Sequence, residues 1–284
     1  MKKGRVDKIL IERGLAETPP KAQAMIMAGL VFGGSGRIEK PGQLIPLDLE
    51  ITVHKPSPFV SRGGLKLEEA LGIFRIEVSG KIGADIGAST GGFTDCLLQR
   101  GAARVYAVDV DIRQIDRKLR NDARVVLIEK NARYLVPEDF AGGPLPDFVV
   151  MDVSFISVLK IMPALKAVLA ERRGGAAAPL AMAGHEAVTS GLLLTLIKPQ
   201  FEAGRLQVGK KGIVRDPTLQ AGVLKKIVGE ASALGFKIQG LVRCATRGKA
   251  GNQEFFARWS LEGLQPSWET VLQWIKEVTR DESD

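Results

Sequence analysis

The chain has 284 residues, of which 45% are hydrophobic, a size that suits one large domain with its own core and one small domain. Its formal net charge of +8 favours a polyanionic partner if the cations cluster, and a generally basic surface is the alternative. The apolar run 191–197 is too short to cross a bilayer, and Cys96 and Cys244 are too isolated to indicate a disulfide framework or a zinc site. Because the start of the chain also lacks the apolar core of a secretion signal, we expect a cytoplasmic protein with no metal and no membrane partner.

The first sixty residues predict a small α+β module. Apolar residues at helical spacing run from Val6 to a glycine stop at Gly14. Thr18 then precedes two prolines, as an N-cap precedes a first helical turn, and a second helix extends to Gly29. Short strands are expected within 30–38 and 47–53, around glycine-rich turns.

This module resembles an S4 RNA-binding domain. The resemblance rests on a leading Arg-x-Asp, here Arg5 and Asp7, and on the stretch AQAMIMAGLV. It implies a phosphate contact for Arg5 and for Lys21, which follows the two prolines where S4 helices commonly begin with Ser-Arg. Nine Lys or Arg residues against six acids over residues 1–60 agree with an RNA partner.

A linker separates this module from the rest of the chain. Pro56 and Pro58, together with the pair Gly63-Gly64, predict a stiff connection that runs into a new helix. We therefore place the domain boundary at residue 58, which gives domains 1–58 and 59–284.

Beyond the linker, strands and helices alternate. Continuous apolar strands are expected at 81–87, 104–110, 125–131, 146–155 and 192–199. Helices are expected from Thr90, near 112–119, over 158–171 and over 218–235. The pattern is typical of an α/β fold with a mostly parallel sheet covered on both faces, and 236–244 with 252–261 predict a terminal antiparallel hairpin. The low-complexity piece 172–191, which contains His185, interrupts this pattern as an insertion of unknown purpose.

The turn after the first of these strands, IGADIGASTGGFTD, is rich in small residues. In a doubly wound sheet such a turn admits a cofactor, but the G-x-G-x-x-G spacing of a dinucleotide site is missing here. The turn resembles motif I of S-adenosylmethionine-dependent methyltransferases with a Rossmann-like fold. Asp109, with Asp111 as the alternative, is the candidate acceptor for the ribose hydroxyls of that cofactor. The expected cofactor-binding residues are Asp85, Gly87, Ser89, Gly91, Gly92, Asp109, Asn131 and Asp152.

Four charged residues beside buried segments carry the strongest signal: Lys66, Asp152, Lys198 and Glu254. Because charges beside buried strands are costly, such groups neutralise one another or serve a site. They resemble the Lys-Asp-Lys-Glu tetrad of FtsJ-like ribose 2'-O-methyltransferases. Together with SRGGLKL, MDVSFIS, LIKPQFEAGR and VGKKGIVRDP, they make the chain similar to the TlyA family of ribosomal RNA methyltransferases.

That resemblance implies S-adenosylmethionine-dependent 2'-O-methylation of ribosomal RNA at cytidine. Lys198 is expected to be the general base, held by Asp152 and Glu254, while Lys66 positions the hydroxyl. Arg62 and two basic loops are expected to bind RNA, and Phe59 or Phe201 either stacks on a displaced base or belongs to the core. The loop candidates are Arg205, Lys210, Lys211, Arg215, Arg243, Arg247 and Lys249.

Two other functions remain open at this stage. A membrane-active haemolysin is one, because that label has been attached to this family, and an RNA-binding protein with a degenerate methyltransferase domain is the other. The apolar segments are too short for the first, and intact residues at all four charged positions oppose the second.

Overall fold

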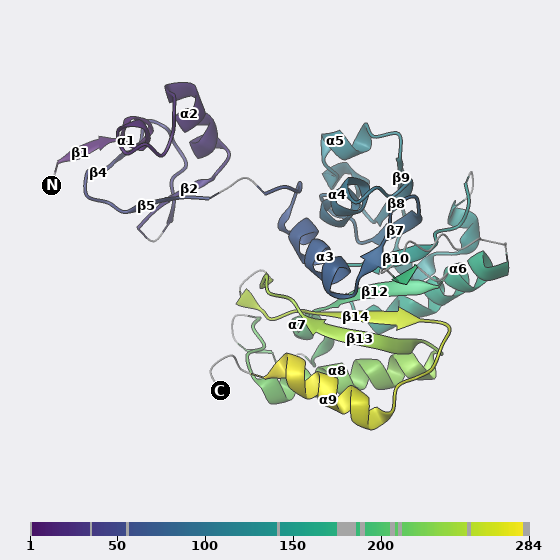
Figure 1. Cartoon of the computed structure of the whole chain (residues 1–284). Coiled ribbons are helices and arrows are strands. Elements are labelled where there is room, and N and C mark those ends of the chain that lie inside the picture. The colour runs from purple at the N-terminus through teal and green to yellow at the C-terminus, as the bar shows by residue number, and fades with distance from the viewer. Residues whose placement is uncertain are drawn as a thin grey trace. The chain divides into compact units, whose positions relative to one another are not determined.

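The computed structural model describes residues 2–34, 36–54, 57–140, 143–174, 186–187, 191–204, 208–209, 212–248 and 251–280. The chain divides into two compact units, residues 1–58 and residues 59–284. Figure 1 shows the course of the chain through both units.

The N-terminal unit packs two helices against short strands. Its helices are α1 (Val6–Glu12) and α2 (Pro19–Met27), and its strands are β1 (Lys3–Arg5), β2 (Val31–Gly33), β3 (Gly36–Arg37), β4 (Leu44–Pro46) and β5 (Ile51–Val53). Strand β1 pairs with β4, while β3, β2 and β5 form a second antiparallel sheet. The Thr18 side chain accepts the backbone N–H of Lys21, which confirms the predicted cap of α2. Val6, Leu10, Ala22, Ile26 and Val31 form the centre of its core.

The second unit is built on a seven-stranded sheet of order β13-β14-β12-β10-β7-β8-β9. Its strands are β7 (Ile82–Ile86), β8 (Arg104–Asp109), β9 (Val125–Glu129), β10 (Phe148–Met151), β12 (Leu192–Ile197), β13 (Lys237–Arg243) and β14 (Phe255–Ser260). The five strands β12, β10, β7, β8 and β9 are parallel to one another, while β14 pairs antiparallel with both β12 and β13. The predicted α/β fold, the mostly parallel sheet and the terminal hairpin are therefore confirmed.

Helices cover both faces of this sheet (Figure 1). On one face, α3 (Arg62–Ile73), α4 (Gly92–Gln99) and α5 (Arg117–Arg120) enclose a core with Leu67, Leu97 and Leu119. On the other, α6 (Met162–Gly174), α8 (Pro217–Ala233) and α9 (Trp268–Thr279) enclose a core with Leu165, Leu224 and Ile275. Burial on both faces explains why the parallel strands are apolar without alternation.

Short elements complete the unit. They are β6 (Ile76–Glu77), which pairs in parallel with β11 (Glu186–Ala187), the helix α7 (Pro199–Glu202), and the 3-10 turns η1 (Ile112–Gln114), η2 (Ala132–Tyr134), η3 (Pro137–Phe140) and η4 (Val158–Lys160). Among the described residues, no helix is long and apolar enough to cross a membrane.

The structure corrects three local expectations. Gly63 and Gly64 are not part of the linker but lie in the first turn of α3, because the Ser61 side chain caps that helix by accepting the Gly63 N–H. The helix expected near 112–119 is split into η1 and α5, since Asp111 and Asp116 each cap a new turn. The helix α9 follows the hairpin, where none was predicted.

The expected insertion 172–191 overlaps ordinary structure at its edges. Residues 172–174 belong to α6 and Glu186–Ala187 form β11. The remainder up to residue 190, including His185, lies outside the described residues. Cys96 and Cys244 are both buried as free thiols.

Candidate active site

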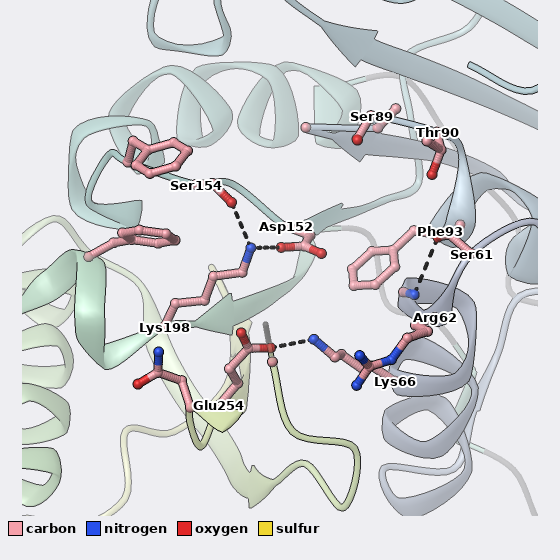
Figure 2. A pocket seen from close by; sticks show the side chains of 18 of the residues that line it. Ser61, Arg62, Lys66, Ser89, Thr90, Phe93, Asp152, Ser154, Lys198 and Glu254 are labelled. Atoms are coloured by element: carbon pink, nitrogen blue, oxygen red, sulfur yellow. Dashed lines mark hydrogen bonds and ion pairs between the residues drawn. The ribbon is translucent and has the colours of Figure 1, made fainter. Parts of the chain in front are cut away.

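A cavity of about 610 Å³ opens where β7, β10 and β12 end at their carboxyl termini. Parallel strands present these ends at one edge of a sheet, so residues far apart in sequence meet there. Figure 2 shows the side chains that face it. Of the expected site residues, the cavity wall contains Arg62, Lys66, Asp85, Gly87, Ser89, Gly92, Asp152, Lys198, Arg247 and Glu254.

The glycine turn after β7 forms one wall of this cavity. Gly87 has a φ of +82°, and a Cβ atom at this position would lie 2.5 Å from the backbone oxygen of Asp152. Ser89 also has a positive φ, of 51°, and Gly91 precedes α4, whose first residue is Gly92. The turn thus leaves a wall of bare backbone at the start of a helix, where a ligand can approach closely.

Asp85 provides a buried carboxylate in this wall. Its Oδ2 accepts hydrogen bonds from the Thr94 N–H at 2.9 Å and the Thr94 hydroxyl at 2.7 Å. Its Oδ1 is buried and has no hydrogen-bond partner within the described part of the chain. Because the group is removed from solvent, the pKa of Asp85 is raised to about 7. An orphaned carboxylate oxygen in a cavity wall suits a ligand with a cationic donor such as an amino group.

Asp109 and Asn131 are not among the residues that line this cavity in the described structure. Asp109 directs its carboxylate to backbone donors, since Oδ2 accepts the Ser89 N–H at 2.8 Å and Oδ1 accepts the Asp111 N–H at 3.0 Å. Asn131 caps η2 through the Arg133 N–H. Asp109 therefore holds the left-handed backbone of Ser89, and the glycine turn depends on this acid.

Lys198 and Asp152 form an ion pair inside the cavity (Figure 2). The Lys198 ammonium lies 2.6 Å from Asp152 Oδ1 and donates to the Ser154 hydroxyl oxygen at 2.9 Å. It also lies 5.8 Å from the centre of the Phe201 ring. Lys198 follows β12 and Asp152 follows β10, so adjacent strand ends bring the two together. Two acceptors and a ring thus fix the position of this nitrogen.

Lys66 and Glu254 form a second ion pair in the same cavity (Figure 2). Lys66 Nζ donates to Glu254 Oε2 at 2.5 Å, and the two residues are 8% and 2% exposed. Glu254 was expected to hold Lys198. In the structure it pairs instead with Lys66, which α3 places beside that carboxylate. The four charged residues share one cavity as two separate ion pairs, and each pair is neutral.

The family model of FtsJ-like methyltransferases matches residues 59–260, which include the whole cavity. The chain belongs to this family. Its members transfer a methyl group from S-adenosylmethionine, which makes this chain an S-adenosylmethionine-dependent methyltransferase. The bare glycine turn and the orphaned oxygen of Asp85 fit that cofactor.

Full-length relatives extend the likeness beyond the catalytic unit. The Bacillus subtilis protein named "Putative rRNA methyltransferase YqxC" is 48% identical over 268 residues, covering 93% of this chain and 89% of that protein. "16S/23S rRNA (cytidine-2'-O)-methyltransferase TlyA" from Mycobacterium tuberculosis is 40% identical over 258 residues, covering 90% and 89%. A solved structure described as "Putative hemolysin from Streptococcus thermophilus" has a TM-score of 0.69 at 42% identity and covers 98% of this chain and 95% of that one.

The candidate RNA-binding residues of this methyltransferase are dispersed. Arg62 opens α3 and donates to the Arg247 carbonyl at 2.7 Å, beside the cavity. Arg5 pairs with Asp7, and Lys21 pairs with Glu17, within the N-terminal unit. Arg215, Arg243 and Arg247 line a smaller cavity. Arg205, Lys210, Lys211 and Lys249 lie outside the described residues.

Some cavity residues were not singled out from the sequence. Phe155 is 89% exposed with a φ of +64°, and its ring lies 4.8 Å from that of Phe201. Ser154, which holds Lys198, lies in the same Asp-Val-Ser-Phe run as Asp152, and this run was the available signal. Of the two aromatic candidates, Phe201 lines the cavity while Phe59 belongs to the core of the α3 face.

Proposed function

We propose that this chain methylates the ribose 2'-oxygen of a cytidine in ribosomal RNA, and that a cytoplasmic ribosomal RNA or ribosomal subunit is its partner. The names of two relatives support the RNA substrate, and one of them specifies the cytidine 2'-oxygen. The observation that carries the proposal is the Lys198–Asp152 pair beside the glycine turn, because a ribose hydroxyl is a weak acid whose proton needs a positioned base.

In this proposal S-adenosylmethionine occupies the part of the cavity between the glycine turn and Asp85. When bound, this cofactor supplies an electrophilic methyl group on a sulfonium. Asp85 Oδ1 is suited to accept from its amino group, and Gly87, Ser89 and Gly92 leave room for the nucleoside. Asp109 acts here through the Ser89 backbone, whose N–H its carboxylate accepts.

Lys198 is the proposed base. In its neutral form, Lys198 Nζ would accept the proton of the 2'-hydroxyl as that oxygen takes the methyl group and the bond from the methyl carbon to sulfur breaks, which leaves S-adenosylhomocysteine. Lys198 would later release the proton to solvent. Asp152 and Ser154 contact this nitrogen and hold it in the cavity. Lys66, itself held by Glu254 in the same cavity, is the proposed group that positions the substrate hydroxyl.

The N-terminal unit is the proposed RNA-recruiting domain. Its order of two helices and short antiparallel strands, its excess of cations and its Arg5–Asp7 pair agree with the S4-like motif read from the sequence. Arg5 is half exposed although paired, and Lys21 is exposed, so both guanidinium and ammonium are accessible to phosphate oxygens.

Substitution of Lys198 tests this function. Lys198→Ala is expected to abolish methyl transfer to ribosomal RNA while cofactor binding and RNA binding persist, because it removes a group used in the reaction. Lys198→Arg is expected to fail as well, since a guanidinium keeps its proton at any working pH. Lys225→Ala, at an exposed lysine of α8, is the matched control and should keep full activity.

The product supplies an independent test of the reaction type. A ribose 2'-O-methyl group blocks alkaline cleavage at its own linkage, whereas a methyl group on the base does not. Mapping of tritium-labelled product after alkaline hydrolysis should therefore show one resistant linkage, at a cytidine. A cleavable linkage at the modified nucleotide would refute 2'-O-methylation, and an active Lys198→Arg variant would reduce Lys198 to a counter-ion.

A further inference from the structure

A second cavity, of about 270 Å³, shares Arg247 with the catalytic cavity. We propose that it is a phosphate subsite, in which Arg215, Arg243 and Arg247 bind a phosphodiester of the RNA next to the target ribose. This inference rests on the proposed ribose methylation for the identity of the ligand. The position and charge of the cavity are independent of that function.

The lining of this cavity favours an anion. Three arginines line it, and none of the described residues that line it is Asp or Glu. Arg243 Nη1 donates to the Arg280 carbonyl at 2.7 Å, while its Nε is buried and has no hydrogen-bond partner in the described structure. A buried donor without a partner is costly, and an anion would satisfy it.

The other two arginines also retain free donors. In the described part of the chain the Arg215 side chain makes no hydrogen bond or ion pair, and the Arg247 side chain makes only a long contact of 3.5 Å to the Gly251 carbonyl. Guanidinium groups bind phosphate oxygens through paired N–H donors, which is the recognition that this cluster allows.

Buried amides fix the walls that carry these arginines. The Asn252 side chain accepts the Val214 N–H at 2.9 Å and donates to the Gly212 carbonyl at 2.9 Å. Gln220 donates to the Val214 carbonyl, and Gln253 donates to the carbonyls of Cys244 and Glu254. The segment before α8 and the hairpin of β13 and β14 are thereby joined, so the guanidinium groups stand on a rigid frame.

The two cavities differ in whether their cations are already paired with carboxylates. Every ribose within an RNA chain is flanked by phosphodiesters, so a site for the 2'-hydroxyl has a phosphate beside it. In the catalytic cavity, Lys66 and Lys198 are paired with Glu254 and Asp152, which neutralise them. Arg247 lines both cavities, and none of the described residues that line the second one is an acid, so its cations remain available to a phosphate.

Binding of a short oligocytidylate RNA to the full chain, measured by fluorescence anisotropy across a range of KCl concentrations, tests the subsite. Arg215→Gln and Arg247→Gln should each weaken binding about tenfold, as expected for a lost charge-assisted hydrogen bond, and lower the salt slope by roughly 0.7. Lys276→Gln removes the same charge from the exposed face of α9 and should change neither value.

Oligonucleotides with uncharged linkages test whether the arginines bind the phosphate group of the RNA. An oligocytidylate with methylphosphonate linkages should bind the wild-type chain more weakly, but should show no further loss with the Arg215→Gln/Arg247→Gln double variant. Equal effects of Arg215→Gln and Lys276→Gln would overturn the subsite, as would an additive loss with neutral linkages. Competition by inorganic phosphate alone, without RNA dependence, would assign the cavity to free phosphate instead. Because these measurements involve no methyl transfer, their failure is distinct from a failure of the proposed reaction.

Discussion

Both hydrogen bonds from Thr94 to Asp85 fall on the same carboxylate oxygen, at 2.9 Å from the N–H and 2.7 Å from the hydroxyl. The other oxygen remains buried without a partner in the described structure. Burial raises the pKa of Asp85 to about 7, although the hydrogen bonds from Thr94 act in the opposite direction, and the nearby charge of Asp152 adds to the rise. A carboxyl group in the cofactor cavity therefore titrates close to neutral pH.

The free energy of unfolding should depend on pH through Asp85. An unfolded aspartate has a pKa of about 3.9, so between about pH 4 and pH 7 the folded chain binds more protons than the unfolded chain. The stability that Asp85 contributes is thus complete below about pH 4 and is lost as the pH rises through 7, by on the order of 4 kcal/mol. Urea unfolding of the wild type and Asp85→Asn across this range should show the difference growing with pH in favour of the variant.

Glu202 is a half-buried carboxyl group whose pKa is also raised, mainly by desolvation, so the wild-type curve alone would mix two groups and the difference between the two proteins is compared instead. Parallel curves for wild type and Asp85→Asn would show that Asp85 is already ionised in the folded chain.

Asp109→Ala should weaken cofactor binding through the glycine turn. The carboxylate accepts the Ser89 N–H, and Ser89 occupies the left-handed region that a serine avoids without such support. Calorimetry with S-adenosylhomocysteine should show an affinity at least tenfold lower, because a cost of about 1.4 kcal/mol corresponds to that factor. Asp111→Ala, at the alternative acid that caps η1, should change the affinity less. Equal affinities for wild type and Asp109→Ala would remove Asp109 from the cofactor site.

The fold could be predicted from the sequence where burial is strongest. Leu192–Ile197 is fully buried, and its sequence is an apolar run interrupted only by Thr195. Lys3–Arg5 and Leu44–Pro46 carry no such pattern, and their pairing depends on contacts some forty residues apart, so β1 and β4 were not expected. The helix α9 was missed although Ser267 caps it and Val271 and Ile275 follow at helical spacing.

The sequence indicated which residues belong to the candidate site but not which of them contact one another. Strand ends indicated that Asp152 and Lys198 meet, because adjacent parallel strands place their carboxyl ends together. No local pattern indicates that Lys66 reaches Glu254, which lies 188 residues away and depends on the packing of α3. Likewise, the use of Asp109 as a support for Ser89 depends on the exact course of the glycine turn.

Removal of residues 1–58 should separate RNA recruitment from catalysis. The two units are compact by themselves, so the shortened chain should remain folded and bind cofactor. Its affinity for ribosomal RNA and the salt dependence of that affinity should both fall, because the unit removed carries an excess of cations. Filter binding at several salt concentrations measures this, with circular dichroism as the check of folding. Equal binding and methylation by the shortened chain would refute the recruiting role.

Removal of one partner of the buried Lys66–Glu254 pair should destabilise the fold, because the other charge is then left buried without a counter-ion. Glu254→Ala leaves a lysine that is 8% exposed without its carboxylate, a change that costs about 3–5 kcal/mol of unfolding free energy in buried pairs. The exposed pair of Arg124 with Asp122 provides a control, since Arg124→Ala should cost less than about 1 kcal/mol. Urea unfolding of the three proteins measures both effects.

The double variant Lys66→Met/Glu254→Leu decides whether that pair serves the fold or the reaction. Apolar side chains of similar volume commonly replace a buried ion pair without loss of stability, so this variant should unfold close to the wild type. If Lys66 positions the substrate hydroxyl, the same variant should bind S-adenosylhomocysteine normally yet lose methyl transfer by at least a hundredfold, as for a group that acts in the transition state. A stable double variant with full activity would show that Lys66 and Glu254 only join α3 to the start of β14, and that Lys198 and Asp152 carry the chemistry by themselves.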